Sequence, residues 1–154
     1  MPQAVLSVTG NRAGDWVSSP VTPADDHWTL VDEAYPPGDN TDYVQCNGFV
    51  DGFLEEFEIS AGPANVHRVT NLNVLMYARG ALISKVPAIR IEVYVGEGLI
   101  GTREFGADSS GAWVAMSVNV TIDVTANTWN AGPRWIRFIG LDGSAGYGDV
   151  PVET

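Results

Sequence analysis

The residue types that support nucleophilic catalysis are scarce in this chain. It contains two histidines, His27 and His67, and a single cysteine, Cys46. A serine or cysteine nucleophile needs a base beside it, usually histidine, and a third group that orients the base. No serine lies in a Gly-x-Ser-x-Gly turn, and Cys46 falls in a predicted strand, where a lone cysteine is usually a small buried apolar residue. We therefore expect no catalytic nucleophile.

Acid–base hydrolysis of a glycoside needs two carboxylates across one cleft. Glu55 and Glu56 are adjacent on a predicted strand, so their side chains point to opposite faces of a sheet and cannot both reach one bond. Glu56 and Glu58 share a face, which we interpret as an exposed strand surface. The sequence predicts that the protein is not an enzyme.

Metal and phosphate sites are also weakly supported. Two histidines and one cysteine are too few for a tetrahedral zinc site, and the glycines of Gly140–Gly148 are not followed by Lys-Ser/Thr and a helix. Calcium needs only carboxylates and carbonyls, and four aspartates flank two loops where they could converge: Asp25, Asp26, Asp39 and Asp42. The alternative is that they are solvated turn residues. We expect these aspartates to be solvated turn residues, and we expect no metal and no other cofactor.

Five tryptophans are the residues that could point outward to a partner: Trp16, Trp28, Trp113, Trp129 and Trp135. Trp113 falls on the polar side of an alternating segment. An exposed tryptophan there could stack on a sugar or anchor a protein interface, where this residue type is enriched. A partly buried tryptophan at a sheet edge is the other interpretation.

The charge of the chain excludes two classes of partner. Eight Lys and Arg stand against 19 Asp and Glu, which gives a net charge of −11. Nucleic-acid binding depends on neutralising phosphates with Lys and Arg, and Lys85 is the one lysine in the chain. We expect no nucleic-acid partner. No window approaches the roughly 18 apolar residues of a membrane-spanning helix, so no membrane partner is expected either.

The elements that must position these residues are strands, because apolar residues recur with a period of two. Six apolar side chains from Val114 to Val124 alternate with small or polar ones, and Ile89–Val95 repeats the pattern. Gly96-Glu97-Gly98 predicts a tight hairpin after the second segment. At most one helical turn fits, near Ala78–Ile83. The predicted strands are Trp28–Val31, Asp42–Cys46, Phe53–Ile59, Arg68–Ala78, Ala88–Val95, Leu99–Phe105, Trp113–Thr125 and Arg134–Leu141.

About eight such strands, separated by Gly, Pro, Asn and Asp turns, predict an all-β fold: an antiparallel two-sheet sandwich, jelly-roll-like. The chain of 154 residues fits one domain, 1–154. Residues 1–23 and 143–154 are poor in periodic signal and are expected to be extended segments, either frayed or ordered against a neighbouring subunit. Arg134–Leu141 is apolar on both faces, so it is a central strand or meets a partner. The N-terminus does not resemble a signal peptide.

Four segments resemble small structural proteins of tailed bacteriophages. They are Trp28–Glu33 (WTLVDE), Gly38–Val44 (GDNTDYV), Phe53–Ile59 and Val69–Arg79 (VTNLNVLMYAR). The resemblance covers roughly residues 28–141. It departs near Asp123–Trp129, where the family pattern has a Pro-x-Thr-Gly-x-x-Trp-like segment.

The resemblance implies a jelly-roll-like virion protein, either a capsid decoration (cement) protein or a tail-associated one. The leading hypothesis is a non-enzymatic decoration protein on the outer capsid surface, made in the host cytoplasm. Its partners would be the major capsid protein and copies of itself, as a trimer. The alternative is a carbohydrate-binding sandwich of a tail spike or fibre. A sandwich hydrolase is a third hypothesis, for which no acid–base pair can be named.

Overall fold

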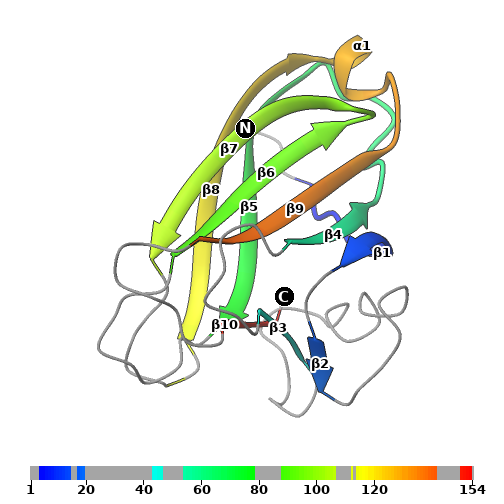
Figure 1. Cartoon of the computed structure of the whole chain (residues 1–154). Helices are drawn as coiled ribbons and strands as arrows, with labels where there is room; N and C mark the ends of the chain where they lie inside the picture. The colour runs from blue at the N-terminus through cyan, green and yellow to red at the C-terminus, as the bar shows by residue number, and fades with distance from the viewer. Residues whose placement is uncertain are drawn as a thin grey trace.

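The computed structural model describes residues 4–14, 17–19, 43–46, 54–78, 88–106, 112, 114–141 and 150–153. Within these residues, ten strands form two five-stranded antiparallel sheets, and one short helix, α1 (Ala126–Trp129), lies at one end of the molecule (Figure 1). The chain is an all-β, jelly-roll-like sandwich, as the alternation predicts. No helix in the described ranges is long and apolar enough to cross a membrane.

The first sheet, sheet A, has the strand order β1-β4-β9-β6-β7. Its middle strand, β9, is the segment that is apolar on both faces. The inward face of β9 carries Ile136 and Phe138, which join the core, and the outward face carries Trp135 and Arg137. The strands are β1 (Val8–Gly14), β4 (Leu54–Ile59), β9 (Arg134–Leu141), β6 (Ala88–Val95) and β7 (Gly98–Gly106).

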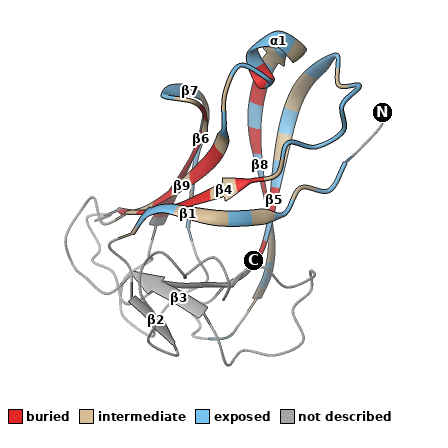
Figure 2. Cartoon of the chain, turned by 90° about the vertical axis from the view of Figure 1, so that its right-hand side faces the viewer, coloured by how far each residue is buried: buried red, intermediate tan, exposed pale blue. Residues whose placement is uncertain are grey.

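The second sheet, sheet B, has the order β2-β3-β10-β5-β8. Its two long strands, β5 and β8, pair along almost their whole length. Because the apolar residues of β8 all fall on one face, burial alternates strictly along this strand, visible as red and blue bands in Figure 2. The strands are β2 (Val17–Ser19), β3 (Tyr43–Cys46), β10 (Val150–Glu153), β5 (Arg68–Ala78) and β8 (Val114–Thr125).

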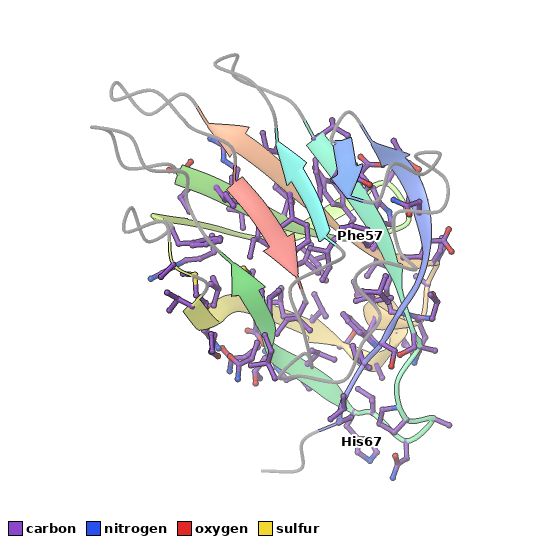
Figure 3. All side chains as sticks on the ribbon, turned by 90° about the horizontal axis from the view of Figure 1, so that it is seen from below. Phe57 and His67 are labelled. Carbon is purple, nitrogen blue, oxygen red and sulfur yellow. The ribbon has the colours of Figure 1, made fainter. Side chains whose placement is uncertain are left out.

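The core lies between the inward faces of the two sheets. β-branched and aromatic side chains dominate it, which is the composition that favours strands. Phe57 of β4 lies between the sheets, whereas His67 lies at the periphery (Figure 3). The buried core residues are Phe57, Ile59, Val74, Met76, Ile89, Ile91, Val93, Val95, Val118, Val120, Ile122, Trp129, Ile136 and Phe138.

Seven of the eight predicted strands are confirmed, each to within one residue at either end. The eighth, Trp28–Val31, lies outside the described residues. The predicted hairpin is also confirmed: Gly96 and Glu97 form the turn between β6 and β7. Gly96 has φ +56°, a conformation that glycine adopts without the steric penalty of a Cβ.

The terminal segments differ from the expectation of extended arms. Within 1–23, β1 pairs with β4 and β2 pairs with β3. Within 143–154, β10 lies between β3 and β5. Their described parts are therefore strands of the sandwich. Three or four residues are too few to show an alternation, and β1 is an edge strand whose pairing is interrupted by two register shifts, which explains why the sequence did not reveal them.

The described residues contain one helical turn, α1. Of the segment Ala78–Ile83, where a helical turn was predicted, Ala78 ends β5 and the rest lies outside the described residues. The hydroxyl of Thr125 caps α1 by accepting a hydrogen bond from the backbone N–H of Thr128. Trp129 is buried and donates its indole N–H to the carbonyl oxygen of Ala61, 3.3 Å away. A single turn is below the length at which helical periodicity can be detected.

Candidate binding face

The residues considered for catalysis do not come together in the described part of the chain. His67 is exposed, and its carbonyl oxygen accepts a hydrogen bond from the backbone N–H of Ala126. His27 and the side chain of Cys46 lie outside the described residues. So do the four aspartates considered for calcium, Asp25, Asp26, Asp39 and Asp42. No group of three His, Cys, Asp or Glu side chains that could hold a metal occurs among the residues the structure describes.

The glutamates of β4 point in opposite directions, as predicted. Glu55 faces inward beside Phe57 and is fully buried, and the side-chain amide of Asn11 donates to its Oε1 at 2.8 Å. Glycine at position 14 leaves room for this carboxylate, because a Cβ there would collide with it. Glu56 faces outward but is only 6% exposed, so the interpretation of its surroundings as an open strand surface was wrong.

Glu56 is buried because it belongs to an ionic row across the outer face of sheet A. The register places Glu56, Arg137 and Glu92 side by side on β4, β9 and β6. Arg137 Nη2 lies 2.7 Å from Glu56 Oε1, and Arg137 Nη1 lies 3.3 Å from Glu92 Oε2. Burial lowers the pKa of Arg137, but the hydrogen bond and the charge of Glu56 outweigh it and raise the pKa.

An aromatic stack adjoins this row. The rings of Tyr94 and Trp135 are parallel, with centroids 4.0 Å apart, and the guanidinium of Arg12 lies 4.3 Å from the centroid of Trp135. Burial raises the pKa of the Tyr94 phenol, and its 2.6 Å hydrogen bond to Glu92 raises it further. Arg12 also reaches Glu97 at 3.2 Å in the β6–β7 turn.

Together these contacts close the outer face of sheet A. Trp135 is only 2% exposed, and its indole N–H donates to the carbonyl oxygen of Gly96 at 2.7 Å. Tyr94 and Arg12 occupy its two ring faces. The Trp135 ring is therefore not available for stacking on a ligand, and we assign these residues a structural role.

The outer face of β5 and β8 is open. We call it the polar strip. The register pairs Asn71 with Thr121, Asn73 with Asn119 and Leu75 with Ser117. All of these side chains are exposed, whereas their neighbours in the strands alternate toward the core. The polar strip consists of Asn71, Asn73, Leu75, Ala115, Ser117, Asn119 and Thr121.

Hydrogen-bonding capacity remains along the polar strip. The amide of Asn119 donates to Oδ1 of Asn73 at 2.6 Å, and the amide of Asn71 donates to Oγ1 of Thr70 at 3.3 Å. An amide group has two donor hydrogens and two acceptor lone pairs, so each of these asparagines can form further hydrogen bonds to a ligand. Leu75, 43% exposed, adds an apolar surface next to Asn73 on the same face of β5.

One ion pair marks the end of the polar strip. Arg68 Nε and Nη2 donate to Oδ1 and Oδ2 of Asp123 at 2.7 and 2.8 Å. The hydrogen bond to Arg68 lowers the pKa of Asp123, and the same bond raises the pKa of Arg68. These two opposite charges are paired with each other at the end of the polar strip, whose seven members carry no charge, in a chain of net charge −11.

The tryptophans are either buried or outside the described residues. Trp129 and Trp135 are both 2% exposed, so neither is the outward-pointing side chain considered from the sequence. Trp113, which the alternation predicts on the same side of β8 as Ser117 and Asn119, lies outside the described residues, as do Trp16 and Trp28. The members of the polar strip were visible in the sequence, but their assembly into one surface depends on the pairing of β5 with β8.

Comparisons with known proteins reveal similarity in fold. No family model and no curated protein matches the sequence. Among solved structures, 95% of the chain superposes on an arabinose-bound GH51 α-L-arabinofuranosidase with a TM-score of 0.51 and 13% identity. The chain spans about a quarter of that enzyme's length, since it covers 24% of it.

Two further structures match with lower scores. One is a family 35 carbohydrate-binding module from an environmental isolate, with a TM-score of 0.45, 19% identity and coverage of 97% of this chain and 93% of the module. The other is the enzymatically active domain of tailspike protein 4 of bacteriophage CBA120, with a TM-score of 0.46, 8% identity and coverage of 97% and 18%. At such identities the likeness concerns the fold alone.

Proposed function

We propose that the chain is a non-catalytic carbohydrate-binding β-sandwich that holds a glycan on the polar strip. The observation that carries this proposal is a solvent-exposed sheet face made of amide and hydroxyl side chains, with one exposed leucine among them. Jelly-roll sandwiches occur as both lectins and capsid proteins, so the choice between these functions depends on the chemistry of the surface.

The composition of the polar strip favours a sugar over a protein partner. Protein interfaces are enriched in aromatic residues, Met and Arg at their centre and depleted in Ser and Ala. The polar strip has Asn, Ser, Thr and Ala, with Leu75 as the one large apolar residue among the side chains that the structure describes on this face. Sugar hydroxyls both donate and accept hydrogen bonds, which matches the amides of Asn71, Asn73 and Asn119.

The strands hold these groups in place before a ligand arrives. Asn73 and Asn119 are directly paired across β5 and β8, and their inward neighbours Val74 and Val118 are buried in the core. A rigid, preorganised site loses little conformational entropy on binding, which improves affinity. The sequence alternation predicts Trp113 on the same side as Ser117 and Asn119, where a tryptophan ring would add a stacking surface for a sugar.

The absence of catalysis is part of the proposal. Glu55 and Glu56, the adjacent carboxylates of β4, lie on opposite faces of sheet A, and both are buried and hydrogen-bonded. Among the side chains that the structure describes on this face of β5 and β8, the one carboxylate is that of Asp123, which is bonded to Arg68, and there is no histidine. A bound glycan would therefore be retained and not cleaved.

The proposal is tested by glycan-array binding followed by calorimetry with Asn73→Ala, Asn119→Ala and Trp113→Ala. We expect each substitution to weaken the best glycan by about tenfold, the effect of losing one to two good hydrogen bonds or a stacked ring. Asn127→Ala is the matched control, because Asn127 is an exposed asparagine on α1 beyond the end of β8. Absence of binding to every sugar by the folded protein would contradict the proposed function.

Capsid decoration, the leading hypothesis from the resemblance, stays a prediction. In that hypothesis the two terminal segments bridge adjacent capsid subunits. The described parts of both segments are strands of the sandwich. Copy number in purified particles tests that role, which requires hundreds of copies per particle.

A further inference from the structure

The positive charges of the described residues lie away from the polar strip, except at its end. Arg12, Arg90 and Arg137 lie on the outer face of sheet A and are bonded to glutamates. Arg134 donates to the carbonyl oxygen of Trp129, and Arg103 lies on β7, the edge strand of sheet A. Arg68 is thus the cation of the polar strip, and both of its bonded nitrogens are directed at Asp123.

An acidic sugar would find no suitable partner there. Carboxylates and sulfates are recognised by charge-assisted hydrogen bonds, most effectively from a bidentate arginine. If Arg68 turned to such a ligand, it would leave Asp123 facing a second anion. Farther away, the net charge of −11 repels polyanions, and the repulsion grows as salt is reduced.

A neutral sugar meets none of these costs. The amides and hydroxyls of the polar strip can form hydrogen bonds to the uncharged hydroxyls of a sugar, and Leu75 can pack against the C–H face of a sugar ring. Asn71 and Asn73 are two residues apart on β5, roughly 7 Å along the strand, and paired residues of β5 and β8 are roughly 5 Å apart. The bonding groups therefore form an extended array along the two strands.

We propose that the polar strip binds a neutral polysaccharide in an extended conformation and excludes polyuronates and sulfated glycans. This inference rests on the proposed glycan-binding function and specifies its substrate class. Recognition is by uncharged hydrogen bonds, so affinity is insensitive to ionic strength.

The experiment uses three matched polymer pairs and measures affinity by calorimetry and affinity gel electrophoresis. The pairs are arabinoxylan and glucuronoxylan, dextran and carboxymethyl dextran, and methyl-esterified and saponified homogalacturonan. We expect the protein to bind at least one neutral polymer, with a Kd that changes by no more than about twofold between about 50 and 500 mM NaCl. Its acidic counterpart should bind at least about tenfold more weakly.

Two variants of one residue test the charge argument directly. Asn119→Asp keeps the side-chain shape but cannot donate to Asn73 and adds a negative charge, so we expect about a tenfold loss of affinity for the neutral polymer. Asn119→Lys should bring measurable affinity for the acidic polymers that falls with salt. Asn127→Asp and Asn127→Lys make the same changes on α1 and should leave both affinities unchanged.

The outcomes separate this inference from the function on which it rests. Tighter binding to the acidic member of a pair, or a Kd that weakens tenfold with salt, overturns neutral specificity and leaves glycan binding intact. If Asn119→Lys has the same preference between neutral and acidic polymers as the natural protein, the binding site does not lie on the polar strip, and the inference is also overturned. No binding to any polymer by a folded protein overturns both.

Discussion

Individual charged residues on the outer face of sheet A act as a structural network. Arg137 lies between two glutamates with side chains only 8% and 12% exposed, and its guanidinium is 5.0 Å from the Tyr94 ring centroid. Charges this well covered are costly unless they are paired and hydrogen-bonded. Arg137 is the cation that contacts both glutamates closely, whereas Arg12 and Arg90 each lie 3.9 Å from one of them, Glu56 and Glu92 respectively.

Replacing Arg137 by alanine should lower the free energy of unfolding by about 3 kcal/mol, the low end for removing one partner of a buried ion pair. The loss arises because Glu56 and Glu92 stay buried near each other without the shared cation. Urea denaturation measures it. Arg103→Ala, which removes an exposed arginine of β7, should change stability by no more than about 0.5 kcal/mol. Equal small losses in both variants would refute the structural role of the row.

At the scale of elements, one side of the sandwich is closed by two strands from different sheets. β7 is hydrogen-bonded to β6 in sheet A, yet Gly101 of β7 lies directly against β8 of sheet B. A Cβ on Gly101 would lie 2.9 Å from the carbonyl oxygen of Thr121 and would also collide with Ile122. An exposed edge strand as long as β8 invites pairing with another chain, and β7 covers part of it.

Gly101→Ala should therefore separate β7 from β8 and destabilise the protein by about 1–3 kcal/mol, the cost of overpacking a tight contact. Gly98→Ala on the same strand is the control, because its nearest atom, the carbonyl oxygen of Val95, is 3.4 Å from the added Cβ. We expect that control to stay within about 0.5 kcal/mol of the natural protein. Thermal unfolding followed by circular dichroism compares the two, and equal stabilities would mean that β7 does not pack on β8.

For the whole molecule, the excess of acidic residues sets the response to salt. Nineteen acidic side chains against eight basic ones leave a net charge of −11, and like charges on a compact domain repel one another. The buried row around Arg137 is screened less by salt than the exposed carboxylates are. Added salt should therefore weaken the repulsion between exposed carboxylates more than it weakens the attraction within the buried row.

Raising NaCl from about 20 to 200 mM should raise the Tm, by about 2–4 °C for each kcal/mol of repulsion that is screened. Sodium sulfate at equal ionic strength is not a suitable substitute, because it also strengthens hydrophobic burial. Scanning calorimetry in NaCl provides the measurement. A Tm that falls over this range would show that exposed ion pairs, such as that of Arg68 with Asp123, contribute more than the net repulsion.

The sequence by itself determined seven of the strands and, for those with clear alternation, which side faces the core. A period of two is a local property, so Val114–Val124 and Ile89–Val95 could be assigned to buried faces without knowledge of their neighbours. For the same reason the opposite orientations of Glu55 and Glu56 were predictable. The scarcity of catalytic residue types also follows from composition alone.

Only the tertiary structure decided which strands lie side by side, since that depends on contacts between residues far apart in the chain. Glu56 meets Arg137 across 81 positions, which turned an expected open surface into a buried ionic row. Trp135 is covered by Arg12 from the first strand, so an outward residue became inaccessible. Asn73 meets Asn119 across 46 positions, and this pairing creates the polar strip. Alternation defines a face of one strand, whereas a binding surface requires the register between two.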